Sequence, residues 1–382
     1  MKILPAALKF TARPMPKDEA RYLKQRLENS KSVDIVCHEL TDRDALNSAR
    51  VMQNYLEQKG IEARIILSQN LDKLEVRNPN FNYIQASDFT PDKTAQTVLC
   101  VDFSRNERVN GKVLEYIKSK KDDVLCIDHH VEPNLLSQGK SLYVDNSAVS
   151  ATSILYRFFE SNNEEITSDD AYRMMLGMVD DGLKNGLFIC DGKEGVLAAT
   201  NELKKDGNAY YVFLALYKRL TDEQIKLITK KIDIMSNLKP NEQKFNDSLY
   251  SRLQFSKNGK IAYVEIPYDD PEWKKLGGDN ARTSTILNRF RQDVINNKFN
   301  DDRLDNVDIA LAFYEAAGDY RISAHSKDPV LEEFFKYIDK KVPYFSQNSG
   351  GHETRRGGKK ADDNLTMHQW VQAIVSCDDF FE

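Results

Sequence analysis

The sequence has 382 residues, of which 41% are hydrophobic and 30% charged, and its formal net charge is −5. This composition is typical of a soluble globular protein with room for two domains, and it excludes the disordered and fibrous classes. The small negative charge also argues against a protein that binds long duplex nucleic acid through a general basic surface.

The longest apolar runs have the length of strands, so no transmembrane segment is expected. The first twenty residues lack a sustained apolar stretch, and a secretory signal is therefore not expected either. Five widely spaced cysteines form neither a disulfide framework nor a CxxC metal motif. We accordingly expect a cytoplasmic protein.

The first half of the chain alternates between two patterns. Short Val/Ile/Leu-rich runs predict strands over 33–38, 63–69, 97–102 and 123–128. Amphipathic stretches predict helices over 44–60, 150–161 and 169–182. Near-continuous apolar strands separated by helices are typical of a parallel sheet with helices on both faces, so this half is predicted to be an α/β domain.

The pattern restarts beyond Pro240. Strands are predicted over 261–267, 307–316 and 320–326, and helices over 282–294, about 329–339 and 366–376, with a glycine-rich loop between the last two helices. This half is predicted to be a smaller, mixed α/β domain. We place the domains at 1–220 and 246–382, with a connecting helix and linker at 221–245.

Polar side chains of one chemical kind stand where the predicted strands of the first half end. The first strand ends at His38, and Asp42 and Asp44 follow it; the others end at Asp102 and at the triplet Asp128, His129 and His130. Asp180 follows a helix, just before Gly182, and the spacing to Gly182 favours it over its neighbour Asp181. Because the carboxyl ends of parallel strands share one edge of a sheet, we expect these groups to converge.

Imidazole and carboxylate groups without thiolates favour a hard or borderline divalent ion such as manganese, magnesium, cobalt or iron. Taken singly, each residue would be a helix cap or a structural group. Together they exceed what one ion needs and suit two ions, manganese in the first place. Two such ions activate a water molecule and neutralise phosphoryl oxygens, which is the chemistry of phosphoester hydrolysis.

At this point the sequence resembles the DHH phosphoesterase superfamily, which includes RecJ-type exonucleases, oligoribonucleases, cyclic-dinucleotide phosphodiesterases and family II pyrophosphatases. The resemblance rests on H-x-x-x-D-x-D at 38–44, the later aspartate Asp102 and the triplet 128–130. It implies that His38, Asp42 and Asp102 hold one metal, and that Asp44, Asp102, His129 and Asp180 hold the other. It also implies catalytic roles for His130, which would contact the scissile phosphate or the leaving group, and for Asp128, which would orient an imidazole.

The second half resembles the DHHA1 domain of the same superfamily. The segment NSGGHETRRGG at 348–358 is similar to its glycine-rich GGGH loop, and YRISAHS at 320–326 to the preceding strand. Glycines let backbone N–H groups approach a phosphate, and nearby cationic side chains add charge. The predicted substrate-binding residues are Gly350, Gly351, His352, Arg355, Arg356 and His325. Phe103, Tyr344 and Phe345 are candidates for stacking on a base.

The sequence thus predicts a two-metal phosphodiesterase that hydrolyses short oligonucleotides or dinucleotides to 5′-mononucleotides. The alternatives are a RecJ-like single-strand exonuclease, a 3′-phosphoadenosine 5′-phosphate phosphatase and a nucleotide-sensing protein without turnover. A family II pyrophosphatase ranks low, because its second domain differs. A short oligonucleotide or dinucleotide is the expected partner, no membrane partner is expected, and a homodimer is left open.

Overall fold

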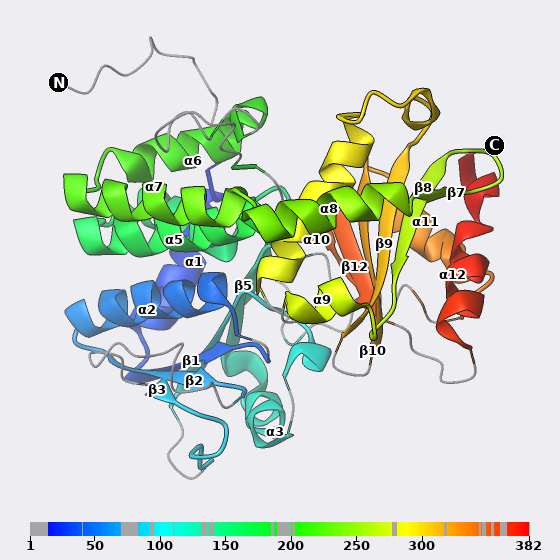
Figure 1. Cartoon of the computed structure of the whole chain (residues 1–382). Helices are drawn as coiled ribbons and strands as arrows, with labels where there is room; N and C mark the ends of the chain where they lie inside the picture. Colours follow the sequence, from blue (N-terminus) through cyan, green and yellow to red (C-terminus); the bar gives the residue numbers. More distant parts are fainter. Residues whose placement is uncertain are drawn as a thin grey trace. The chain divides into compact units, whose positions relative to one another are not determined.

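The computed structural model describes residues 14–39, 41–69, 83–91, 95–109, 111–130, 136, 141–184, 187–188, 200, 203–276, 281–316, 319–343, 345, 349–352, 355–359 and 365–381. The chain divides into two compact units (Figure 1), the first comprising residues 1–182 and 187–232 and the second residues 183–186 and 233–382. No helix in these described ranges is long and apolar enough to cross a membrane.

The first unit is built on a six-stranded sheet in the order β3-β2-β1-β4-β5-β6, and all of its strand pairs are parallel. Its strands are β1 (Ser32–Cys37), β2 (Glu62–Leu67), β3 (Tyr83–Ile84), β4 (Thr97–Val101), β5 (Val124–Asp128) and β6 (Leu142–Val144). The chain runs outward from β1 to β3 and then crosses to β4. Strands β1 and β4 are therefore the point where the strand order reverses, and this is where α/β sheets bind ligands.

Helices cover both faces of this sheet. The helices of this unit are α1 (Lys17–Glu28), α2 (Arg43–Gln58), α3 (Gly111–Ser119), α4 (Ala151–Ser161), α5 (Ser168–Lys184), α6 (Gly207–Tyr217) and α7 (Asp222–Ser236), and the last residues of α5 and α7 belong to the second unit. Val113 and Ile117 of α3 pack in one cluster with Val98 and Cys100 of β4, while α2 packs against β1 and β2 (Figure 1). The predicted parallel sheet with helices on both faces is confirmed.

The second unit has a mixed sheet in the order β11-β12-β10-β9-β8-β7, in which only the β8–β9 pair is parallel among the described strands. Its strands are β7 (Gln254–Phe255), β8 (Ile261–Ile266), β9 (Ile309–Ala316), β10 (Asp319–Ser326), β11 (Ser349–His352) and β12 (Arg355–Lys359). Its helices are α8 (Pro240–Ser251), α9 (Pro271–Lys275), α10 (Ala281–Ile295), α11 (Leu331–Ile338) and α12 (Met367–Val375). The mixed α/β architecture predicted for this half is confirmed.

Alternating residues of β9 divide the core of the second unit into two layers. Leu311 and Phe313 pack with α11 and α12, whereas Ala310 and Ala312 pack with α8 and α10. Successive side chains of a strand point to opposite faces of the sheet, so a strand buried on both faces contributes alternate residues to two core layers.

The predicted glycine-rich loop at 348–358 is wrong in part, because two paired strands occupy most of it. Gly350 pairs with Gly357 and His352 with Arg355 in the β11–β12 hairpin, and β12 also pairs with β10. Glycine is a poor strand former by itself, so the pairing comes from the neighbouring strand β10.

Candidate metal centre

Two strand ends at the point of reversal bring the first functional groups together. His38 follows β1 and Asp102 follows β4, and His38 Nε2 lies 3.2 Å from Asp102 Oδ2. Both side chains are buried. Asp42, the N-cap of α2, lies at the edge of this group, with its Oδ1 4.0 Å from His38 Nε2.

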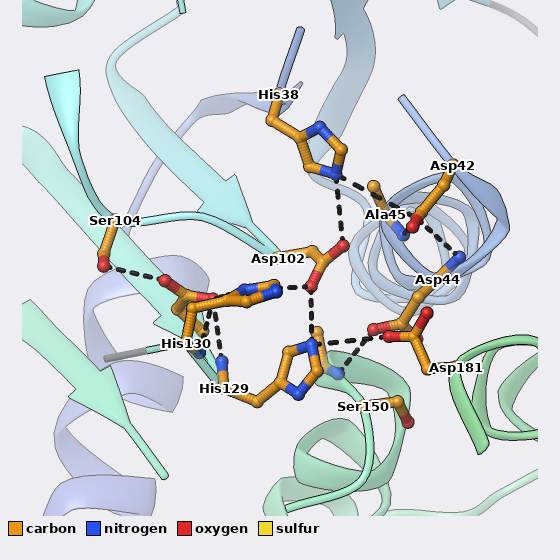
Figure 2. Close-up of polar contacts among 12 residues, drawn as sticks. His38, Asp42, Asp44, Ala45, Asp102, Ser104, His129, His130, Ser150 and Asp181 are labelled. Carbon is orange, nitrogen blue, oxygen red and sulfur yellow. Dashed lines mark hydrogen bonds and ion pairs between the residues drawn. The ribbon is translucent and has the colours of Figure 1, made fainter. Parts of the chain in front are cut away.

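Asp102 joins this group to a second one. Its Oδ1 lies 3.2 Å from His129 Nε2, and His129 Nε2 lies 3.4 Å from Asp181 Oδ2. Figure 2 shows Asp102 between the two imidazoles, with Asp44 and Asp181 beyond His129. Ligand atoms of His38, Asp42 and Asp102 lie within 4.8 Å of one another, and so do those of Asp44, Asp102, His129 and Asp181. A third group, made of Asp102, His129 and His130, meets the same limit, so all three groups share Asp102.

The backbone of Asp102 is unusual. Its φ is +64°, in the left-handed region that non-glycine residues seldom adopt. Its N–H donates to Ile127 O of the next strand at 2.9 Å, which holds the turn in place. Strain of this kind gathers at functional positions, because it directs one side chain toward a site at a cost in stability.

The two ligand histidines are held in one tautomer by the backbone. His38 Nδ1 lies 2.6 Å from Glu39 O, and His129 Nδ1 lies 3.3 Å from Ala148 O. Because a carbonyl oxygen only accepts, each Nδ1 carries the hydrogen, and each Nε2 is the nitrogen that faces the carboxylates. This is the arrangement in which a histidine binds a metal through Nε2.

Asp44 is fixed by the N-terminus of α4. Its carboxylate accepts hydrogen bonds from Ala151 N at 2.6 Å, from Thr152 N at 3.1 Å and from Thr152 Oγ1 at 2.7 Å. Helix α5 passes close by, and a Cβ at Gly177 would overlap Asp44 Oδ1 and lie 2.5 Å from Thr152 Oγ1. Only glycine therefore lets α5 approach Asp44. Thr152 and Gly177 are contributors that the sequence prediction missed, although a glycine inside a helical pattern is a signal of close packing.

The structure corrects the prediction for Asp180. Asp181 stands with His129 and Asp44, whereas Asp180 Oδ1 pairs with Lys231 Nζ at 2.7 Å and lies outside the groups of described residues that could hold a metal. Adjacent residues on a helix point about 100° apart, so only one of the two can face the centre. Asp181 takes the place that spacing alone gave to Asp180.

Asp128 lies behind the centre and holds the turn that carries the imidazoles. Its Oδ1 accepts from His129 N at 2.8 Å, His130 N at 3.1 Å and His130 Nδ1 at 2.8 Å. Its Oδ2 accepts from the buried Ser104 Oγ at 2.7 Å. These bonds fix the orientation of the His130 ring, whose Nε2 is left for contact with another group. Ser104 is a further contributor that the sequence prediction missed.

Electrostatics in the centre favour cations. Burial raises the pKa of Asp44, and the charges of Asp102 and Asp181 raise it further. Burial alone would lower the pKa of His129, but Asp102 and Asp181 hold it well above 6.5. Burial alone would raise the pKa of Asp102, but its contacts with His129 and His38 keep it well below 3.8. Without a metal, protons on the imidazoles must therefore offset the buried carboxylates.

The donor set fits a pair of divalent cations. Carboxylate and imidazole donors suit manganese, magnesium or iron, and Asp102 Oδ1 is buried without a hydrogen-bond donor in bonding geometry among the described residues. The buried carboxylates of Asp44, Asp102 and Asp181 have ligand atoms within 4.8 Å of one another and need positive charge nearby, which two ions held by these groups would supply.

The predicted substrate-binding residues belong to the second unit. His325 is buried in β10, and its backbone pairs with that of Arg355 in β12. Gly350, Gly351, His352 and Arg356 lie in the same hairpin backbone, and the placement of their side chains lies outside what the structure describes. Phe103 and Phe345 are buried in the cores, so the prediction that they stack on a base is wrong, and Tyr344 lies outside the described residues.

Comparison with known proteins agrees with this fold. Residues 32–178 match the model of the DHH family, N-terminal domain. An exopolyphosphatase-related protein from Bacteroides fragilis has a similar structure at 14% identity, with 97% of this chain and 98% of that chain covered and a TM-score of 0.69. RecJ from Thermus thermophilus, in complex with Mn²⁺, is similar at 13% identity, with 98% and 56% covered and a TM-score of 0.50.

At these identities the two structures show a shared fold, and this chain spans about half of the RecJ chain. The search of curated protein sequences found no match. Residues 32–178 thus match a DHH-family N-terminal domain, and this segment carries His38, Asp42, Asp44, Asp102 and His129 of the convergent site. The assignment of the second unit as a DHHA1 domain stays a prediction.

Proposed function

We propose that this protein is a two-metal phosphodiesterase that hydrolyses dinucleotides or short oligonucleotides to 5′-mononucleotides. The observation that carries the proposal is the sharing of Asp102 by two groups of ligand atoms, each within 4.8 Å. When bound, a pair of divalent cations lowers the pKa of a water molecule and neutralises charge on the phosphoryl oxygens.

The residues of the chain supply position and charge. His38, Asp42 and Asp102 would hold one ion, and Asp44, Asp102, His129 and Asp181 the other. Nδ1 of His38 and Nδ1 of His129 keep their hydrogens because they donate to the carbonyl oxygens of Glu39 and Ala148. In each ring Nε2 is therefore the nitrogen that would bind the metal. Asp44, Asp102 and His129 are buried in the first unit, away from water. Electrostatic interactions of these groups are stronger there than they would be in water.

His130 is the proposed contact to the substrate. Its side chain is 19% exposed, whereas those of His129 and Asp102 are 1% exposed. With Nδ1–H committed to Asp128, its Nε2 is available to a phosphoryl oxygen or to the leaving oxygen. In this reaction water attacks phosphorus, the P–O3′ bond breaks, and the O3′ atom leaves with a proton.

The second unit is proposed to hold the remainder of the substrate. Gly350, Gly351, His352, Arg355, Arg356 and His325 are the proposed contacts, on the strength of the resemblance to the glycine-rich DHHA1 segment. Manganese is the proposed metal, with magnesium, cobalt and iron as alternatives.

The test is a product-resolved assay with Mn²⁺ over a panel of substrates. The panel contains pApA, cyclic di-AMP, a five-nucleotide RNA, the matched DNA, 3′-phosphoadenosine 5′-phosphate, pyrophosphate and polyphosphate. We expect pApA and the short RNA to give 5′-mononucleotides. Turnover of phosphoadenosine phosphate alone, or of polyphosphate alone, would replace the proposed substrate. Tight binding of nucleotides without turnover of any substrate would point to a sensing protein.

A further inference from the structure

Arg43 stands in an unfavourable position. It is the first residue of α2, between Asp42 and Asp44, which both belong to the metal centre. A cation at the start of a helix is disfavoured by the helix dipole, and here it would also repel the metal ions. A residue that breaks local rules in this way usually serves a function.

Stability does not account for this arginine. Its one ion pair among the described residues is with Asp180, where Arg43 Nη1 lies 3.8 Å from Oδ1, and its side chain is 61% exposed. Exposed pairs of this kind contribute at most about 1 kcal/mol. The guanidinium therefore keeps most of its donors toward solvent, on a residue that stands between two members of the candidate metal centre, Asp42 and Asp44.

Asp180 is itself held in place. Its Oδ1 accepts from Lys231 Nζ of α7 at 2.7 Å, and the side chains of Asp180 and Lys231 are only 15% and 10% exposed. Arg43 faces the same oxygen of this carboxylate. The Lys231–Asp180 pair thus places a fixed carboxylate oxygen next to the exposed Arg43 guanidinium.

Exposure shows from which side a substrate can reach the centre. Asp42 is 31% exposed and His130 19%, whereas the ligands beneath them are almost fully buried. Arg43 directly follows Asp42 and, at 61% exposed, is more accessible than either of them. A guanidinium binds phosphate oxygens with two parallel hydrogen bonds, which a lysine ammonium cannot do.

We infer that Arg43 is a specificity-determining residue that contacts a second phosphate of the substrate, next to the one being cleaved. This inference rests on the proposed function and names its substrate class: linear dinucleotides and oligonucleotides with a 5′-phosphate, such as pApA, rather than ApA. Asp180 is a positioning residue that acts through Arg43.

The test compares pApA with ApA in the Mn²⁺-loaded protein. Arg43→Gln should raise KM for pApA about tenfold or more, the effect of losing one charge-assisted hydrogen bond, and change KM for ApA less than about twofold. Its kcat and its bound manganese, measured by elemental analysis, should stay the same, and Arg43→Lys should restore part of the difference. Arg173→Gln is the matched control, because it removes another arginine–aspartate pair from α5.

A binding measurement separates this inference from the proposed function. A pApA analogue with a 3′-methylene phosphonate linkage is not hydrolysed, and Arg43→Gln should weaken its binding only when the analogue carries the 5′-phosphate. If the wild-type protein binds the analogue but hydrolyses nothing, the proposed function fails and the role of Arg43 still stands. Equal losses with both substrates, no loss with pApA, or a fall in bound manganese would overturn the inference.

Discussion

Nε2 of His129 lies 3.4 Å from Oδ2 of Asp181 and 3.2 Å from Oδ1 of Asp102, so one imidazole joins a strand end to a helix turn. The ring enters from β5, Asp102 from β4 and Asp181 from α5. Because Nδ1 of His129 donates to the carbonyl oxygen of Ala148, the ring is held in the orientation in which Nε2 faces the two carboxylates. The candidate metal centre is thereby built on strand ends and a helix, which suits a site of fixed geometry.

The neighbouring aspartates of α5 should have different effects. Asp181→Asn should lower manganese affinity by at least about tenfold, since even residues that only orient metal ligands contribute roughly 10- to 100-fold. Asp180→Asn is the matched control and should keep the full complement of manganese. Isothermal titration with Mn²⁺ measures both. Loss of metal from the Asp180 variant, with the Asp181 variant unaffected, would restore the assignment made from spacing.

Gly177→Ala should disrupt the centre through packing alone. A Gly→Ala change inside a helix normally stabilises a protein by about 0.5–1 kcal/mol. Here the new methyl group would collide with Asp44 and Thr152, so we expect a loss of about 1–3 kcal/mol. Urea unfolding in EDTA measures the stability, and Mn²⁺ titration should show weaker binding as Asp44 is displaced. A gain in stability with unchanged metal binding would show that the helix has room.

The metal-free protein should lose stability as the pH rises above 6.5. The pKa of His129 is held well above 6.5 by Asp102 and Asp181, so the folded chain binds a proton that the unfolded chain has released. This contribution is complete below pH 6.5 and disappears as the pH passes the folded pKa, at up to about 1.4 kcal/mol per pH unit for one proton. The raised pKa values of His38 and Asp44 act in the same direction.

Urea unfolding in EDTA at pH 6, 7 and 8 checks this dependence. Saturating Mn²⁺ should reduce the slope, because a metal replaces the proton at Nε2, and metal uptake should release protons into a weakly buffered solution. His129→Gln should also reduce the slope. A stability that rises from pH 6 to pH 8 without metal would contradict the assigned charges.

Much of the centre could be predicted from sequence because parallel strands impose it. Apolar runs that end abruptly in Asp or His place those residues at one sheet edge, and His38, Asp102 and His129 meet there. Asp181 could not be distinguished from Asp180 in this way. Which of the two aspartates faces the centre depends on how α5 packs. Gly177 allows α5 to lie close to Asp44, and this contact joins residues far apart in the sequence.

The second unit shows the limit of local patterns more clearly. A glycine-rich segment reads as a loop because glycine has little strand propensity, but β10 offers an open edge that pairs with β12. Likewise, aromatic residues near a predicted site look available for stacking, whereas Phe103 and Phe345 are needed to fill the cores. Burial of this kind is a property of the assembled fold.

The count of manganese ions bound per chain, in the wild type and in Asp102→Asn, tests the central claim most directly. Asparagine accepts a φ of +64° as readily as aspartate, so this variant removes the shared carboxylate charge without the backbone strain that alanine would add. We predict two ions per chain in the wild type, at most one weakly held ion in the folded variant, and a loss of phosphodiesterase turnover of more than about a hundredfold. A wild-type protein that binds no manganese-class ion, or a variant that keeps two ions and full turnover, would contradict the account.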